Sequence, residues 1–265
     1  MYDCVRNRQK GSKSVTQIRF GPEPLRVLVT GFGPFPGAAC NPSAWLAEHL
    51  QANPCKQLSD IALTSHVLET SWHYVDRYFE PLIEAVMPHV AIHFGLDQSG
   101  SQFRIETRAR NNAARSADCN GAHFKRSNIV AGAPHILSTT LPHWPLIDRL
   151  RKQQLPAHAS QDAGHYLCNY LYYLSLWNSR RAESPRLTCF VHIPPMPEIQ
   201  TYHSRHCKSR GNMLSPAELV RGTHEIISYA VNVYRQRPSS REPHAPPPGG
   251  RSLMAVTSGA TDGDG

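Results

Sequence analysis

The sequence predicts an α/β fold: a single α/β/α sandwich domain with a mostly parallel central sheet. Segments with strand-like and helix-like patterns alternate between Leu25 and Tyr234. The chain has 265 residues, of which 40% are hydrophobic, so it is long enough to bury one large core. No apolar run is long enough to span a bilayer, which favours a protein without a membrane partner.

Three regions follow from the composition. Residues 1–24 are basic and polar and predict a flexible tail, without the apolar run of a secretory signal. Residues 25–236 carry the alternating segments and predict the folded domain. Residues 237–265 are rich in Pro, Gly and Ser and predict a disordered tail.

Charge and cysteine content restrict the class of protein further. The formal net charge is +8, which permits contact with nucleic acid, but the basic residues are spread along the chain and accompany no nucleic-acid-binding motif. We therefore expect a solvated basic surface and no nucleic-acid partner. Seven scattered cysteines, an odd number, argue against a disulfide framework and predict a reducing, cytoplasmic location.

The first half of the domain is predicted to form three strands and two helices. Buried strands are expected where short apolar runs end in glycine or polar residues, and helices where apolar residues recur at helical spacing. The expected strands are 25–30, 60–68 and 89–94, and the expected helices are 41–50 and 71–87.

The second half adds two strands and two helices. Residues 103–111 alternate strictly and predict one strand, with Glu106 on the same face as Arg104 and Arg108. Residues 162–177 predict a helix and residues 187–193 a buried strand. Residues 215–234 predict a last helix that begins with a capping box.

In such sheets the functional site lies beyond the carboxyl ends of the strands. The glycine turn at 31–37 follows the first strand, but Pro36 stands where a dinucleotide-binding turn needs glycine. We expect either a structural turn or a rigid apolar lip, with Phe32 and Phe35 facing a small flat ligand. The segment after Phe94 and the strand-terminal His192 lie at the same edge.

Cys168 is expected in the first turns of its helix, where the helix dipole stabilises a thiolate. Cysteine is also a common core residue, and Cys189, inside a strand, fits that interpretation. His192 precedes two prolines that hold it stiffly, as suits a general base, although a histidine is often only a structural side chain. Glu106 is either a solvated strand residue or a carboxylate kept ionised by arginines, available to orient an imidazole.

Metal and cofactor signals are weak. His203, His206 and Cys207 are ligand types, but their spacing matches no established zinc pattern. No P-loop and no G-x-S-x-G motif is present. We expect neither a metal nor an organic cofactor.

Together, three blocks make the chain resemble the pyroglutamyl peptidases, also called pyrrolidone-carboxylate peptidases, which are thiol exopeptidases. Residues 29–35 with Asn41-Pro-Ser43 resemble the family's opening strand and pocket loop. Residues 164–169 resemble its nucleophile block, and residues 190–194 with Pro197-Glu198 its histidine block. The order glutamate, cysteine, histidine also agrees.

The resemblance implies release of an N-terminal pyroglutamyl residue from peptides by a Cys168–His192–Glu106 triad through a thioester, without a cofactor. It also implies a lactam pocket and assembly into a homo-oligomer. The residues expected to line that pocket are Phe32, Phe35, Asn41, Leu96, Tyr166 and Leu167.

The chain departs from the family pattern near the acid. Leu96 stands where the family usually has Gln, and Arg110 replaces an apolar residue. Two alternatives stay open: a cysteine amidase acting on another small lactam or acyl amide, and a non-catalytic peptide-binding relative.

Overall fold

The computed structural model describes residues 23–53, 58–182, 184–196 and 213–237. Its central sheet has the strand order β2-β1-β3-β8-β4-β7, and β5 and β6 form a separate antiparallel pair. The strands are β1 (Leu25–Phe32), β2 (Ile61–Leu68), β3 (Val90–Leu96), β4 (Phe103–Glu106), β5 (Arg108–Arg110), β6 (Ile136–Ser138), β7 (Ala157–Ser160) and β8 (Leu187–Ile193).

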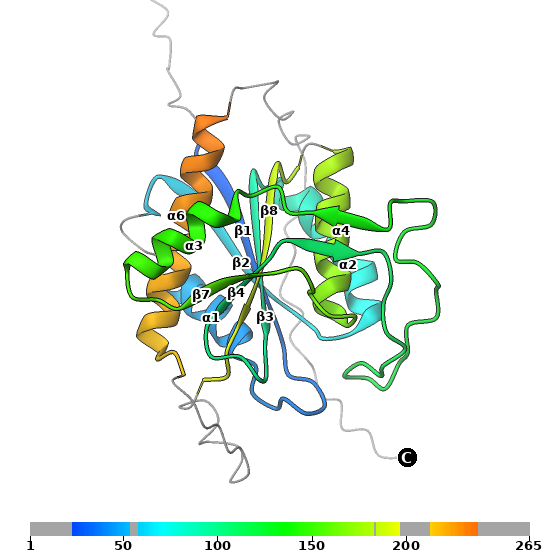
Figure 1. Cartoon of the computed structure of the whole chain (residues 1–265). Coiled ribbons are helices and arrows are strands. Elements are labelled where there is room, and N and C mark those ends of the chain that lie inside the picture. Colours follow the sequence, from blue (N-terminus) through cyan, green and yellow to red (C-terminus); the bar gives the residue numbers. More distant parts are fainter. Residues whose placement is uncertain (1–22, 54–57, 183, 197–212, 238–265) are drawn as a thin grey trace, which may run out of the picture.

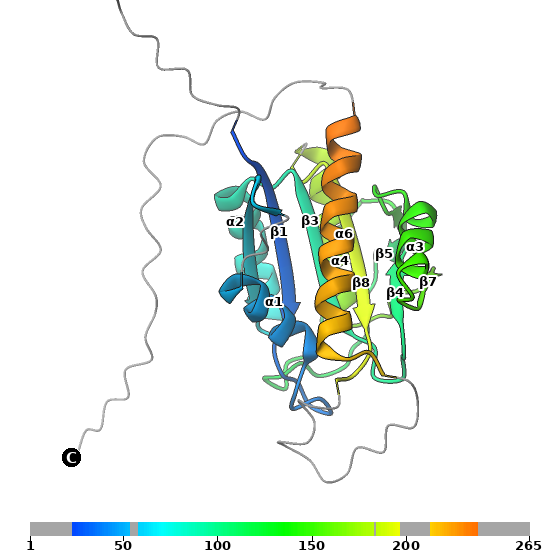
Figure 2. The same ribbon diagram turned by 90° about the vertical axis from the view of Figure 1, so that its left-hand side faces the viewer.

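Helices cover both faces of the sheet (Figures 1 and 2). On one face, α1 (Pro42–Ala52), α3 (His143–Lys152) and α6 (Pro216–Gln236) enclose one apolar cluster. On the other face, α2 (Trp72–Val86) and α4 (Leu167–Arg181) enclose a second. The α/β/α sandwich predicted from the sequence is confirmed.

Strands β2, β1, β3 and β8 are parallel, which brings their carboxyl ends to one edge of the sheet. Strand β4 runs antiparallel to β8 and parallel to β7. The start of β4 therefore lies beside the carboxyl end of β8, with Arg104 opposite His192 in the register. This reversal lets β4 deliver side chains to the edge where β2, β1, β3 and β8 end.

Local sequence signals explain where the helices begin. The side chain of Asn41 accepts a hydrogen bond from the Ser43 N–H and caps α1, with proline in the first turn. Ser71 caps α2 through the Tyr74 N–H. Ser215 and Glu218 form the expected capping box at the start of α6.

Two predicted elements are wrong in extent. The strand expected over 103–111 ends at Glu106, and a separate strand, β5, begins at Arg108. The chain changes partner at Thr107, because its N–H bonds to the Ser160 carbonyl at the end of β7 while its carbonyl accepts from the Thr139 N–H beside β6. The helix expected from residue 162 begins five residues later, at Leu167. Gly164 with φ +78° and the extended Tyr166 prevent an earlier start.

Strands β6 and β7 and helix α3 were not predicted from the sequence. The tails expected at 1–24 and 237–265, and the weak ligand group at 203–207, lie wholly or almost wholly outside the described residues. Within the described residues, no helix has the length and apolar character needed to cross a membrane.

Candidate active site

Cys168 lies in the first turn of α4, directly after the N-cap Tyr166 and Leu167. The backbone N–H groups of that turn and the helix dipole favour an anion at this position. Its sulfur packs on the backbone at the end of β3, so a Cβ added to Gly95 would lie 2.8 Å from the Cys168 Sγ and 2.9 Å from the Phe190 ring. Gly95 is therefore required for the sulfur to reach the edge of the sheet.

His192 meets the sulfur from the neighbouring strand. It lies in β8, pairs with Gly95 across the β3–β8 ladder and is only 4% exposed. It therefore lies beside the Cys168 sulfur, which packs against Gly95. The two residues come from α4 and β8, and Gly95 of β3 is the point where they meet.

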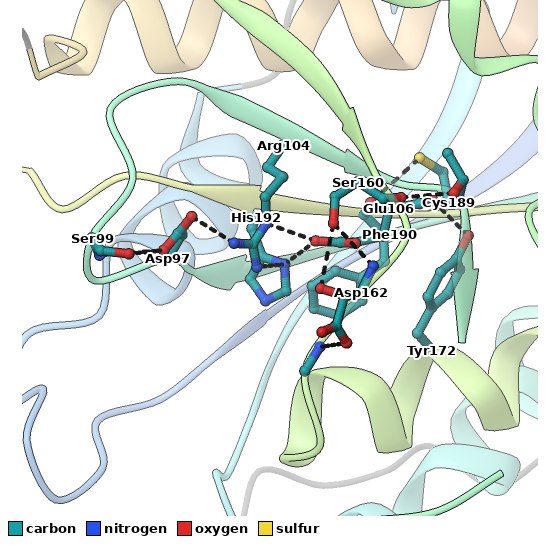
Figure 3. Close-up of polar contacts among 12 residues, drawn as sticks. Asp97, Ser99, Arg104, Glu106, Ser160, Asp162, Tyr172, Cys189, Phe190 and His192 are labelled. Atoms are coloured by element: carbon teal, nitrogen blue, oxygen red, sulfur yellow. Dashed lines mark hydrogen bonds and ion pairs between the residues drawn. The ribbon is translucent and has the colours of Figure 1, made fainter. Parts of the chain in front are cut away.

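Glu106 lies beside the imidazole of His192 (Figure 3). Its Oε1 lies 2.7 Å from the His192 Nδ1. An ionised carboxylate only accepts hydrogen bonds, so Nδ1 donates to it and Nε2 is left for the sulfur. Glu106 is 0% exposed, so the alternative of a solvated strand residue is wrong.

The electrostatic surroundings favour a charged imidazole. Burial alone lowers the pKa of His192, but the Cys168 and Glu106 side chains, through their charges and hydrogen bonds, raise it to about 9. A thiol and an imidazole arranged in this way can exist as a thiolate–imidazolium pair, the reactive form of a cysteine nucleophile.

An aromatic group surrounds the start of α4. The ring of Tyr166 lies 6.0 Å from that of Phe35 and 5.3 Å from that of Trp72, centroid to centroid. The Tyr166 hydroxyl donates to the Ala117 carbonyl at 3.0 Å. Burial and the nearby acidic groups Asp118, Cys119 and Cys168 raise the pKa of Tyr166 to about 12, so it remains a neutral hydrogen-bond donor.

The remaining expected pocket residues differ in accessibility. Leu96 ends β3 and is partly exposed, as is Phe35. Phe32 is 2% exposed and Leu167 is 0% exposed, and both pack in the cluster under α2 and α4. Asn41 is buried and its Nδ2 donates to the Gly33 carbonyl at 3.1 Å, which fixes the turn that carries Phe35.

Comparison with known proteins decides the family. The family model described as pyroglutamyl peptidase matches residues 25–225, three quarters of the chain. The chain belongs to the pyroglutamyl peptidase family. It is accordingly an enzyme of the cysteine peptidase class, and the resemblance seen in the sequence is confirmed.

Similar proteins of this family come from archaea and bacteria. The pyrrolidone-carboxylate peptidase of Pyrococcus furiosus is 36% identical over 175 residues, 66% of this chain and 83% of that protein. The Bacillus mycoides enzyme is 31% identical over 65% of this chain and 79% of its own length. A crystal structure of the P. furiosus pyrrolidone carboxyl peptidase superposes with a TM-score of 0.72 at 31% identity, over 79% of this chain and 100% of that one.

Some residues of the candidate site were not singled out from the sequence. Trp72 carries no motif and reaches Tyr166 only through the packing of α2 on α4. Asn169 was noted only as part of a block. It is fully buried. Its Oδ1 accepts from the Arg110 N–H, and its Nδ2 donates to the Arg110 and Asn112 carbonyls. These bonds connect the end of β5 and the segment after it to the start of α4. Arg104, which the sequence placed on the same strand face as Glu106, contacts the Glu106 carboxylate.

Cys189 confirms the structural interpretation made from its position inside a strand. It is 1% exposed, and burial followed by the charge of Glu106 raises its pKa to about 12. It remains a thiol at physiological pH and differs in this from a nucleophile. Among the described residues, no cluster of three or more His, Cys, Asp or Glu has the arrangement of a metal site.

Proposed function

We propose that this enzyme removes N-terminal pyroglutamate from peptides, with Cys168 as nucleophile, His192 as general acid and base, and Glu106 as the group that orients His192. One observation supports this most: the His192 Nδ1 lies 2.7 Å from the Glu106 Oε1, and the Cys168 sulfur packs against Gly95, the register partner of His192. Nucleophile, base and orienting carboxylate in that relation define a hydrolytic triad.

In the proposed reaction the Cys168 thiol gives its proton to the His192 Nε2, and the thiolate attacks the pyroglutamyl carbonyl carbon. The carbonyl electrons move to oxygen, where backbone N–H groups of the first turn of α4 and of the loop after Gly95 stabilise the charge. The intermediate collapses, the C–N bond breaks, and His192 protonates the leaving amine. A thioester between Cys168 and the pyroglutamyl group remains.

Water completes the cycle. His192, now neutral, takes a proton from water as it attacks the thioester carbonyl, and the C–S bond breaks to release pyroglutamate and the Cys168 thiolate. Glu106 accepts from Nδ1 throughout and stabilises each imidazolium form. Every proton moves between Cys168, His192, the amine and water, so the steps need no cofactor.

The pocket for the lactam is proposed beside Cys168. Phe35, on the turn fixed by Asn41, and Tyr166 offer partly exposed aromatic rings whose centroids lie 6.0 Å apart. Leu96 closes the β3 side. Phe32 and Leu167 lie behind these groups and contribute the floor. A flat, neutral ring suits such an apolar pocket with backbone polar groups nearby.

The test is a substrate panel with a matched cysteine control. A pyroglutamyl fluorogenic amide is offered beside alanyl and prolyl amides to the wild type, Cys168→Ala and Cys119→Ala. We expect turnover of the pyroglutamyl amide alone, a loss of at least about 10³-fold in kcat/KM for Cys168→Ala, and wild-type activity for Cys119→Ala. Comparable turnover of all three amides contradicts the specificity, and an active Cys168→Ala contradicts the mechanism.

The two alternatives correspond to other outcomes of the same panel. Turnover of a different lactam or acyl amide, with loss in Cys168→Ala, identifies a cysteine amidase. Binding of pyroglutamyl peptide without turnover, together with no alkylation of Cys168 by iodoacetamide at neutral pH, identifies a non-catalytic relative. The departure at Leu96 makes both worth measuring.

The cellular setting is also a proposal. We propose that the enzyme works in the cytoplasm as a homo-oligomer on pyroglutamylated peptides, without nucleic acid as a partner. Four cysteines of the described part of the chain, Cys40, Cys119, Cys168 and Cys189, are free thiols, which fits a reducing compartment. Light scattering of the purified chain measures the oligomeric state, and a monomer at all concentrations contradicts that part.

A further inference from the structure

Arg104 lies where β4 begins, beside the carboxyl end of β8, and contacts three other groups of the site (Figure 3). Its Nε donates to the Glu106 Oε1 at 2.8 Å and its Nη1 to the Asp97 Oδ2 at 2.8 Å. Its Nη2 lies 3.1 Å from the His192 Nδ1. The Arg104 side chain is 25% exposed and that of Asp97 12%, so this network is only partly screened by water.

Two donors converge on one carboxylate oxygen. The Glu106 Oε1 takes both the His192 Nδ1–H at 2.7 Å and the Arg104 Nε–H at 2.8 Å. The buried Oε2 has no hydrogen-bond partner among the described residues. Glu106 is therefore shared, and its charge is divided between an imidazole and a guanidinium.

The third contact of Arg104 is unfavourable when the imidazole is charged. The His192 Nδ1 carries the proton donated to Glu106, so it cannot also accept from the Arg104 Nη2. A permanent guanidinium charge then stands 3.1 Å from a ring nitrogen of the imidazolium. Like charges at this separation disfavour the protonated form of the histidine.

Asp97 holds the opposite end of Arg104. Its backbone N–H bonds to the Ile193 carbonyl at 2.8 Å, directly after His192, and its side chain accepts from the Ser99 N–H. The Asp97 carboxylate holds the Arg104 guanidinium group in place and neutralises part of its charge. The loop after β3 and the acid of the triad are thereby joined through one side chain.

We propose that Arg104 is a positioning residue: it holds the Glu106 carboxylate in place for His192 and limits the stabilisation of the imidazolium. This rests on the proposed function of the triad. The charged and titratable groups around the imidazole are Cys168 from α4, Glu106 and Arg104 from β4, and Asp97 through Arg104. Three of them are acidic, and Arg104 is the opposing charge.

The proposed acid–base reaction benefits from a cation that opposes the acidic groups around His192. His192 must give a proton to the leaving amine and then take one from water, which is most efficient when the imidazole titrates near the working pH. Cys168 and Glu106 together hold its pKa above the ordinary value. A cation beside Nδ1 restrains that rise and keeps the neutral base accessible for the second step.

The test compares Arg104→Met with Arg108→Met, a neighbouring arginine that contacts Gln161 and not the triad. The titration of His192 is followed by NMR of the imidazole nitrogens in the substrate-free enzyme, beside kcat and KM across pH. We expect the His192 midpoint in Arg104→Met to rise by about one pH unit. We also expect kcat at neutral pH to fall about tenfold, with little change in KM. A midpoint equal to those of the wild type and Arg108→Met overturns the proposal.

Asp97→Asn is a second test, in which the titration midpoint of His192 should move in the opposite direction. Removing the carboxylate leaves the Arg104 charge less neutralised, so the His192 midpoint should fall below that of the wild type. Arg104→Lys keeps the positive charge but removes the planar guanidinium group. In this variant the His192 midpoint should stay near that of the wild type while kcat falls. If Arg104→Met does not fold, these two variants decide, and an unchanged or higher midpoint in Asp97→Asn overturns the proposal.

The NMR titration tests the role of Arg104 independently of the proposed substrate. A midpoint that moves as expected in an enzyme that ignores pyroglutamyl amides contradicts the substrate and supports the role of Arg104. Turnover of pyroglutamyl amides with a midpoint that does not move contradicts the role of Arg104 alone.

Discussion

Two buried histidines on neighbouring strands have opposite surroundings. His93 in β3 is 0% exposed, and His192 in β8 is 4% exposed. The His93 ring nitrogens meet two hydroxyls, those of Thr30 and Ser175, each at 2.8 Å. The His192 imidazole lies between the Cys168 thiol and the Glu106 carboxylate.

The pKa values diverge accordingly. Burial lowers the pKa of His93 to about 3. Burial also lowers that of His192, but the charges and hydrogen bonds of Cys168 and Glu106 reverse the effect and raise it to about 9. Burial alone therefore makes a structural, neutral histidine, and a charged partner on each side makes one suited to acid–base chemistry.

The largest expected effect separates the two histidines by activity. His192→Gln should lower kcat/KM by about 10³- to 10⁴-fold, because the proposed general acid and base is lost. His93→Gln should keep kcat/KM within about threefold, because its partners are hydroxyls away from the sulfur. Both are measured with the pyroglutamyl amide. Equal losses in the two variants would contradict the distinction drawn between them.

The next effect concerns the carboxylate. Glu106→Gln keeps a group of the same shape but removes the charge, so we expect kcat to fall about 10²- to 10³-fold and the His192 pKa to fall toward neutrality. The alkaline limb of kcat/KM should move to lower pH. Its position in the wild type and in Arg108→Met is the reference, and an unmoved limb with full kcat contradicts the role of Glu106.

The stability of the fold should depend on pH through His93. Its folded pKa lies below the ordinary 6.5, so its contribution is present above pH 6.5 and is lost as the pH falls toward 3. Between pH 7 and 4.5 the wild type should lose roughly 2 to 3 kcal/mol that His93→Gln does not lose. Urea unfolding of both proteins at the two pH values measures this, and parallel losses would show that His93 does not titrate in this way.

The smallest effect tests the hydroxyl partner. Thr30→Val keeps the shape of the side chain and removes the bond to the His93 Nδ1, so we expect a loss of about 1 to 2 kcal/mol in the free energy of unfolding. His93 should remain neutral and kcat/KM nearly unchanged. An appearance of His93 titration above pH 6 in this variant would contradict the view that burial sets its state.

Much of the fold was predictable from the sequence, because local signals agree with it. Capping residues such as Ser215 with Glu218 mark helix ends, and apolar runs such as Leu187–Ile193 mark buried strands. The break at Thr107 was not predictable, because strict alternation describes a pleat and not the partner strand. Strand β7, Ala157–Ser160, is short and lacks β-branched residues, so no propensity distinguishes it.

The residues of the candidate site that lie in sequence motifs were predictable. Cys168 and His192 lie in blocks with recognisable residue types, and Glu106 in a strand whose other residues suggested a solvated face. The pairing of Arg104 with Glu106 follows from their shared strand face. The contact of Arg104 with His192 was not predictable, because it depends on the antiparallel pairing of β4 with β8. The contact of Trp72 with Tyr166 depends in the same way on the packing of α2 against α4.

The most direct test of the account is a titration of His93 and His192 in one substrate-free sample, followed by NMR of the imidazole nitrogens. We expect that at pH 7 His192 is an imidazolium that loses its proton only near pH 9, while His93 is neutral at pH 7 and gains a proton only as the pH falls toward 3. We also expect Cys168→Ala to lower the His192 midpoint and to leave His93 unaffected. A neutral His192 at pH 7, or a midpoint that ignores Cys168, would contradict it.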